Sequence, residues 1–193
     1  MSIPALYSAQ RKQRALKAAK RKAKAARLRK ARQAPTVDGR TISVPARATH
    51  GGEEEKLKRQ LHAVIRAHYG PTCISCRKDG LTPRVPRVGG NWEAGHLFAV
   101  GPYPALKFHP LNIASQCSYC NGQLRGNHAA YSAAFIRRHG IATFEAMDAI
   151  KGQPRKFAIS DLIELRQALT HGGLDGYSEL YFTITGWCVE RAA

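Results

Sequence analysis

Apolar residues recur with the spacing of amphipathic helices in four parts of the chain. In the first part Leu57 and Leu61 share a face with later apolar positions, and Gly70 ends the pattern. Asn127 and Ser160 stand where N-caps of later helices are expected. The predicted helices cover residues 53–70, 128–140, 142–151 and about 160–170.

The region between the first two predicted helices has no regular apolar spacing and is rich in proline and glycine. Strand-like runs occur near 83–88 and over 92–100. The C-terminal tail is ambiguous, because the sequence YFTIT at 181–185 favours a strand but is short. Helices that flank a few short strands predict a small α+β fold.

The positive charge of the chain is concentrated at its N-terminus. Residues 1–50 hold 14 lysines and arginines against one acid, so they contribute +13 of the net +18 of the 193-residue chain. Residues 11–33 carry 12 basic residues and no acid, in a stretch rich in helix formers. Such an arm is typical of nucleic-acid binding, because neutralised phosphates release condensed counterions. A solvated spacer is the alternative, and an anionic membrane surface is disfavoured because the arm has no bulky apolar face.

Composition therefore divides the chain into four parts. We expect a basic arm that is helical or disordered (1–33), a linker (34–52), a central domain (53–151) and a C-terminal helical extension (152–193) that is a candidate dimer or DNA contact. The candidate phosphate contacts in the arm are Arg11, Lys12, Arg14, Lys17, Lys20, Arg21, Lys22, Lys24 and Arg27.

The sequence contains no apolar run of the roughly 18 residues that a membrane span needs. The basic N-terminus is not followed by an apolar stretch typical of a secretory signal, so we expect a cytoplasmic protein. In a reducing compartment the five cysteines are first considered as metal ligands and only then as disulfides.

Four of the cysteines form two C-x2-C pairs, Cys73 with Cys76 and Cys117 with Cys120. Two such pairs suit one tetrahedral structural zinc, and the second pair runs into a helix-like segment, which is the arrangement of a treble-clef zinc finger. A redox C-x2-C is disfavoured because a thioredoxin-like βαβ pattern is missing. Cys188 has no obvious partner.

The stretch NWEAGHLFAV at 91–100 holds a single histidine, His96, in an apolar run. Three interpretations are open from the residues alone: a buried structural histidine, a zinc ligand, or a general base. The four cysteines can fill a zinc site by themselves, which leaves His96 for another use. A neutral imidazole is a suitable base near pH 7.

These motifs resemble, in their order and spacing, the HNH or ββα-metal nucleases, in the zinc-clamped form of phage recombination endonuclease VII. A closer resemblance is to the NinG/Rap recombination proteins of lambdoid phages, and it covers roughly residues 57–170. Relatives of the lambda type carry a further cysteine-containing segment near the N-terminus, which this chain does not have, and the last twenty or so residues are unmatched. The matching motifs are CISC (73–76), WEAGH (92–96), LKF (106–108), NIASQCSYCN (112–121), GN (126–127), Tyr131 and IRRHG (136–140).

The resemblance implies a role for each candidate site residue. His96 would be the general base, Asn112 would hold the loop and orient the histidine, and Asn121 would bind a catalytic metal. The acid that usually precedes the base is replaced by Gly95, so Glu93, on the same face of a strand, would take its place. The simpler alternatives are a turn residue for Asn112, an N-cap for Asn121, and a surface charge or ion pair for Glu93.

The resemblance also implies a function. It predicts a metal-dependent endonuclease, with structural Zn²⁺ and catalytic Mg²⁺ or Mn²⁺, that cuts branched recombination intermediates such as Holliday junctions and D-loops. Arg125, Arg137 and Arg138 would add phosphate contacts to those of the arm. A homodimer and contacts with phage or host recombination proteins, in the bacterial cytoplasm, are further expectations. The rival functions are a non-catalytic architectural DNA-binding zinc protein, an HNH nuclease of linear duplex and, more weakly, an RNA-binding protein.

Overall fold

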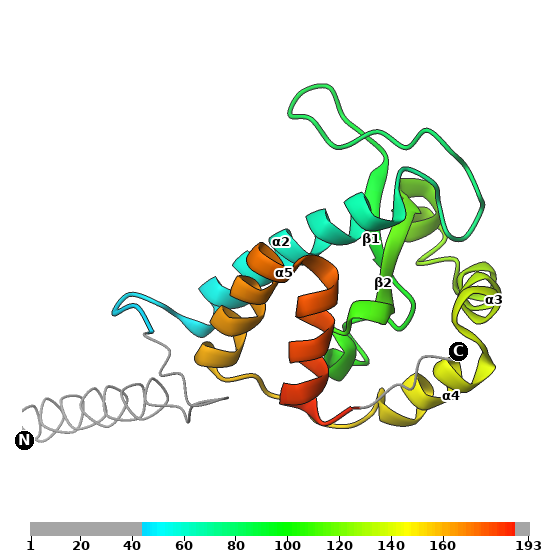
Figure 1. Ribbon diagram of the computed structural model, residues 1–193. Helices are drawn as coiled ribbons and strands as arrows, with labels where there is room; N and C mark the ends of the chain where they lie inside the picture. Colours follow the sequence, from blue (N-terminus) through cyan, green and yellow to red (C-terminus); the bar gives the residue numbers. More distant parts are fainter. Residues whose placement is uncertain (1–43, 188–193) are drawn as a thin grey trace, which may run out of the picture.

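The computed structural model describes residues 44–187 (Figure 1). The predicted basic arm, with its candidate phosphate contacts, and Cys188 lie outside the described residues. The chain is a small α+β fold with one two-stranded sheet among the described residues. Its elements are α2 (His50–Tyr69), β1 (Trp92–His96), η1 (Pro104–Leu106), η2 (Pro110–Asn112), β2 (Ile113–Cys117), η3 (Tyr119–Gln123), α3 (His128–His139), α4 (Ile141–Ile150) and α5 (Ile159–Thr185).

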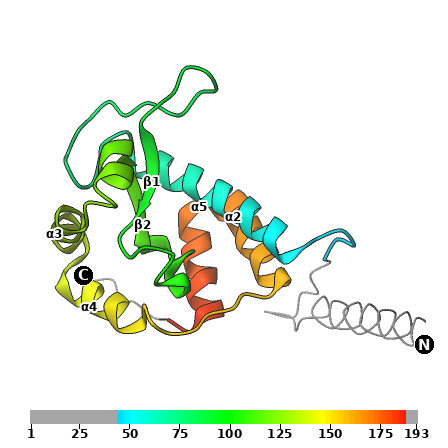
Figure 2. The same ribbon diagram turned by 180° about the vertical axis from the view of Figure 1, so that it is seen from behind.

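Helices α2 and α5 run side by side and form one wall of the main core (Figures 1 and 2). The predicted apolar face of α2 is confirmed, since Leu57, Leu61 and Ile65 are fully buried against α5 and the hairpin. Arg166 of α5 also pairs with the buried carboxylate of Glu53, Nη2 to Oε2 at 3.3 Å. Residues 159–185, predicted as an extension, therefore complete the same core as α2.

The β-prone stretch of the ambiguous tail is helical in the structure. Residues 181–185 are the last turn and a half of α5, which continues beyond a break at Gly173 (φ 59°, ψ −149°). Tyr177 and Tyr181, four residues apart, are both fully buried, and the Tyr177 hydroxyl donates to the Phe108 carbonyl at 2.7 Å. Burial of two large aromatic side chains at helical spacing outweighs the local strand preference.

The expected helix starts also need correction. Helix α2 begins at His50, within the predicted linker, because the Thr49 hydroxyl accepts from the Gly52 amide at 3.2 Å. Helix α5 is capped at Ala158 and not at Ser160: the Asp161 carboxylate accepts from the Ala158 amide at 2.8 Å. Asn127 does precede α3, but in a left-handed conformation and without a capping side-chain bond.

The strand predicted over 92–100 is confirmed only as far as His96. It pairs with β2 in antiparallel register, with Trp92 opposite Cys117 and His96 opposite Ile113. The run at 83–88 forms only an isolated bridge between Val85 and Gly89. Residues 71–91 instead make a long irregular connection between α2 and β1, visible at the top of Figure 1.

The two faces of the hairpin belong to different cores. Ala94 and Ile113 pack with α2 and α5, whereas Ala114 packs with α3 and α4 residues such as Tyr131 and Met147. Side chains alternate along a strand, so neighbouring residues of β1 enter different surroundings. Of the helices in residues 44–187, none is long and apolar enough to cross a membrane.

Candidate metal and nuclease site

The four cysteine thiols of the two C-x2-C pairs meet at one point. Their sulfur atoms all lie within 4.8 Å of one another, and each of these cysteines is free. The Cys76 and Cys117 sulfurs are 3.8 Å apart. A tetrahedral zinc with bonds of about 2.3 Å needs sulfurs about 3.8 Å apart. The cluster is therefore of the size that zinc requires, and the predicted clamp is confirmed as a cluster that could bind it.

The thiols of this cluster differ in their ease of ionisation. Burial raises the pKa of the Cys120 thiol to about 12. For the exposed Cys76 slight burial works in the same direction, but hydrogen bonds from the Lys78 backbone and the neighbouring thiols bring its pKa to about 7. The Asn127 amide donates to the Cys120 sulfur at 3.4 Å, which explains why this asparagine does not cap α3. A divalent ion would stabilise all four thiolates together.

Gln116 links the two halves of this clamp. Its Nε2 donates to the Ser75 hydroxyl at 2.7 Å, between the first two cysteines, and to the Gly126 carbonyl at 2.6 Å, after the second pair. The side chain is fully buried and crosses β1 at Gly95: a Cβ at that position would lie 2.0 Å from Gln116 Oε1. The acid expected at position 95 is thus excluded because Gln116 already occupies its space.

Glu93 and Asn121 lie in direct contact. The Asn121 Nδ2 donates to Glu93 Oε2 at 2.6 Å, and both side chains are partly buried. Glu93 stands on β1, and Asn121 follows Cys120 directly in the middle of η3. The remaining carboxylate oxygen and the amide oxygen are hard donors of the kind that Mg²⁺ and Mn²⁺ prefer.

His96 occupies the other face of β1, towards α2. Its Nε2 bonds to the Lys107 carbonyl at 3.2 Å, and its ring lies edge-on to that of His62, 5.5 Å between centroids. Burial lowers the pKa of His96, and the nearby charges of Lys58 and Lys107 lower it further. The imidazole is therefore neutral near pH 7, and no hydrogen bond from residues 44–187 engages its Nδ1.

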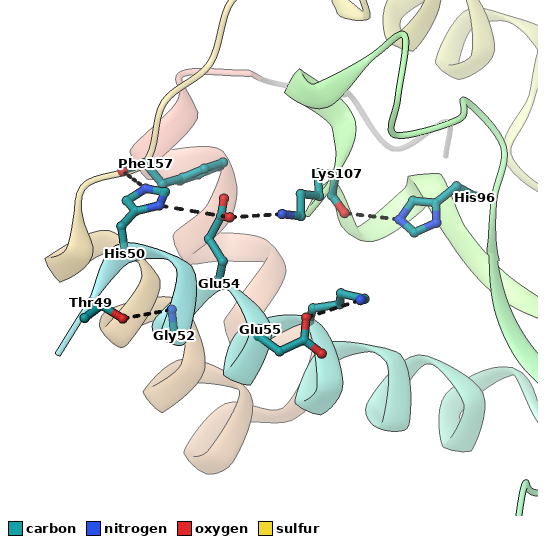
Figure 3. Close-up of polar contacts among 9 residues, drawn as sticks. Thr49, His50, Gly52, Glu54, Glu55, His96, Lys107 and Phe157 are labelled. Carbon is teal, nitrogen blue, oxygen red and sulfur yellow. Dashed lines mark hydrogen bonds and ion pairs between the residues drawn. The ribbon is translucent and has the colours of Figure 1, made fainter.

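Lys107 is held both by its side chain and by its backbone carbonyl (Figure 3). The Lys107 ammonium pairs with Glu54 Oε2 at 3.1 Å, and the same oxygen lies 4.0 Å from the ring of His50. On the other side of His50, Nε2 bonds to the Phe157 carbonyl at 2.9 Å. The carbonyl that orients His96 is thus tied to the N-terminal turns of α2.

The Asn112 side chain forms hydrogen bonds with the backbone of the loop that carries Lys107. Its Nδ2 donates to the carbonyls of Phe98 and Leu106, each at 3.0 Å, and its Oδ1 accepts from the Phe98 amide at 2.8 Å. The side chain is fully buried. Asn112 therefore bonds to the backbone of the loop, whereas the atom that bonds to His96 is the Lys107 carbonyl and not the Asn112 amide.

The three predicted arginines outside the arm are exposed. Arg125 has a left-handed backbone (φ 49°) in the turn before α3. Arg137 and Arg138 lie in the last turn of α3, and the Arg138 guanidinium covers the Tyr69 ring at 4.7 Å. Arg125 and Arg137 remain candidate phosphate contacts, whereas Arg138 also has a packing role.

Sequence reasoning missed two residues of this site. Gln116 could be found only from the strand register, which sets it opposite Glu93. His62 follows the buried Leu61 in a helix whose pattern explained only the apolar face, and no motif indicated that its ring would contact His96.

One protein-family model matches most of the chain. The model described as the bacteriophage lambda NinG protein matches residues 5–172. The chain belongs to the NinG family. The cysteine cluster, His96, Asn112 and the Glu93–Asn121 pair all lie within the region that carries the NinG match.

Individual NinG relatives match shorter parts of the chain. It is 36% identical over 76 residues to protein ninG of Salmonella phage P22, which covers 39% of this chain and 34% of that protein. It is 37% identical over 79 residues to protein ninG of Escherichia phage lambda, a match that covers 41% of this chain and 33% of that protein. Protein ninG of Enterobacteria phage H19B is 29% identical to it over 98 residues, a match that covers 49% of this chain and 47% of that protein. The chain thus spans about a third of the length of the first two relatives. No solved structure matches it.

Proposed function

We propose that this NinG-family chain is a metal-dependent DNA endonuclease of the HNH class, built on a zinc-clamped treble-clef core. The observation that carries the proposal is the contact between Glu93 and Asn121 at 2.6 Å. It joins the acid of β1 to the residue that follows the second cysteine pair. Glu93 can therefore supply the carboxylate that Gly95 lacks.

The donor chemistry of this pair suits a hard divalent cation. Glu93 would offer a carboxylate oxygen and Asn121 its amide oxygen, with the present hydrogen bond between them released or rotated. A bound Mg²⁺ or Mn²⁺ supplies positive charge to the phosphate and to the leaving oxygen. The zinc clamp and Gln116 hold Asn121 in place against β1, because both bind the segment that carries it.

His96 would act as the general base on water. Its Nε2 is oriented by the Lys107 carbonyl, which leaves Nδ1 for the proton transfer. Burial keeps the pKa of His96 below its usual value, so the base form predominates at neutral pH. Asn112 and the Glu54–Lys107 ion pair fix the loop that supplies this carbonyl.

The base and the acid leave β1 on opposite faces, three residues apart. β1 has a partner strand on one edge only within residues 44–187. We infer that a phosphate that contacts both groups approaches β1 from the edge that has no partner strand. The expected substrate is branched DNA, bound through its backbone by the basic arm and the exposed arginines, in the cytoplasm of a bacterial host and with a homodimer as the expected form. Recombination proteins of the phage or host are expected partners.

The test is a cleavage assay on linear duplex, single strand, fork and four-way junction, with Mg²⁺, Mn²⁺ or EDTA. We expect junction cutting that needs metal and falls by at least about a hundredfold in His96→Ala, the range of a lost acid–base residue. Glu93→Gln and Asn121→Ala should also lose activity and should weaken Mn²⁺ binding. His171→Ala and Glu145→Gln remove an exposed histidine and an exposed acid elsewhere and serve as matched controls.

The two DNA-binding rivals each have their own outcome in this assay. Binding without cutting in any metal would identify an architectural DNA-binding protein. Equal cutting of linear duplex and junction would identify an HNH nuclease without branch selectivity. Unchanged cutting by Glu93→Gln with His96 intact would remove Glu93 from the metal site.

A further inference from the structure

A basic stripe runs along one face of α2 beside His96. Lys58, His62 and Arg66 are spaced four residues apart, so they lie on one side of the helix and span about 12 Å along its axis. All three are partly buried, one position further along the helix than the core residues Leu57, Leu61 and Ile65.

The middle of this stripe touches the candidate base. The rings of His62 and His96 are 5.5 Å apart in an edge-on arrangement. Burial lowers the pKa of His62 to about 3, and the neighbouring His96, Lys58 and Arg66 act in the same direction. Lys58 also lowers the pKa of His96. The charges of the stripe are therefore close enough to act on both imidazoles.

The stripe is largely unneutralised in the protein itself. Lys58 pairs with Glu55 at 3.3 Å, but both side chains are about half exposed, and such a pair is worth little. Neither His62 nor Arg66 has an ion pair to another residue in the range 44–187. Positive charge held beside an imidazole, with only the exposed Glu55 to balance it, is complementary to a phosphate chain.

We propose that Lys58, His62 and Arg66 form a track that binds the phosphate backbone of DNA and leads the strand to His96. The track would be separate from the basic N-terminal arm and from the exposed arginines of α3. This inference rests on the proposed function, because it takes the nucleic acid to be the substrate of the nuclease. Contacts to phosphates set the position of the strand and do not read its sequence.

Substitution of the charged Lys58 and Arg66 should change the salt dependence of DNA binding, whereas substitution of the neutral His62 should not. Each phosphate neutralised on duplex DNA contributes about 0.9 to the slope of log affinity against log salt concentration. The double change Lys58→Gln with Arg66→Gln should therefore lower that slope by about 1.8. His62 is neutral at pH 8, so His62→Ala should leave the slope unchanged while it weakens binding about two- to tenfold, as for one hydrogen bond.

The experiment uses the full chain, loaded with zinc, in EDTA-free buffer without Mg²⁺ or Mn²⁺, so that binding is measured without cutting. Fluorescence anisotropy of a labelled duplex and a labelled four-way junction gives the affinity at a series of salt concentrations. The control is Arg59→Gln, which removes one positive charge, half of that lost in the double variant, from an exposed position next to the stripe on the same helix. Circular dichroism confirms that each variant is folded.

The outcomes separate this proposal from the function. A lower slope in the double variant, with Arg59→Gln close to the unchanged protein, supports the track. An unchanged slope in the double variant overturns it, and so does a fall of about 0.9 in Arg59→Gln, which is the same change per charge as in the double variant. If the protein cuts DNA and the double variant binds normally, the track fails while the nuclease stands. If the track is found but nothing is cut, the nuclease fails while the DNA-binding surface stands.

Discussion

One methyl group added at position 95 tests the geometry that excludes an acid there. In Gly95→Ala the new Cβ would lie 2.0 Å from Gln116 Oε1, 2.9 Å from its Cδ and 3.0 Å from its Cβ. Gln116 is fully buried, and its amide is held by the Ser75 hydroxyl and the Gly126 carbonyl, so it cannot move without losing these bonds.

The loss of stability expected in Gly95→Ala follows from these contacts. Overpacking a buried site costs about 1–3 kcal/mol, and each lost hydrogen bond adds about 0.5–1.5 kcal/mol. With both Gln116 hydrogen bonds lost, we expect Gly95→Ala to lower the free energy of unfolding by about 2–6 kcal/mol. Urea denaturation followed by circular dichroism, with zinc in constant excess, measures this change through the midpoint and slope of the transition.

Two further variants decide whether Gln116 is the cause. Gly122→Ala is the matched control, because a Cβ there meets nothing within 4 Å, and it should stay within about 0.5 kcal/mol of the unchanged protein. In a Gln116→Ala background the cost of Gly95→Ala should largely disappear, which a double-mutant cycle measures directly. A Gly95→Ala protein as stable as the unchanged one, or a cycle without coupling, would refute the steric explanation.

Three other predictions follow from buried polar groups. Cys117→Ser should abolish stoichiometric zinc binding, seen by elemental analysis, and should lower the melting temperature as much as a chelator does. Asn112→Ala should cost about 3 kcal/mol in urea unfolding, because it leaves buried backbone groups of Phe98 and Leu106 without partners. Burial lowers the pKa of His109 to about 3, so its contribution to stability is complete above about pH 6.5 and is lost at about 1.4 kcal/mol per pH unit as the pH falls towards 3. His109→Phe should remove that part of the slope in unfolding titrations, and a slope that stays unchanged would contradict it.

The sequence was informative wherever one local rule determined the structure. The two C-x2-C spacings predicted the thiol cluster because each pair needs only a short knuckle to bring its sulfurs together. The apolar spacing of α2 predicted its buried face, and Gly140 marked the end of α3. The resemblance to NinG proteins, drawn from motifs in order along the chain, was confirmed.

The sequence failed where long-range packing decided the structure. The strand preference of residues 181–185 was overridden because Tyr177 and Tyr181 fill the core as helical residues. The sequence could not explain why position 95 is glycine, because the explanation depends on the strand register that places Gln116 opposite Glu93. The orientation of His96 by a carbonyl eleven residues away likewise needs the closed loop.

Strand β1 joins two parts of the protein that are stabilised by different means. The face with Glu93 and Gly95 is held by the cysteine clamp through Gln116, whereas the face with His96 is held by α2 and the loop that Asn112 fastens. Loss of the metal should therefore disturb the Glu93 face first, while the helical core keeps His96 in place. If the chain is a nuclease, loss of a structural zinc should act on activity mainly through the Glu93–Asn121 pair, because Asn121 follows Cys120 directly in the chain.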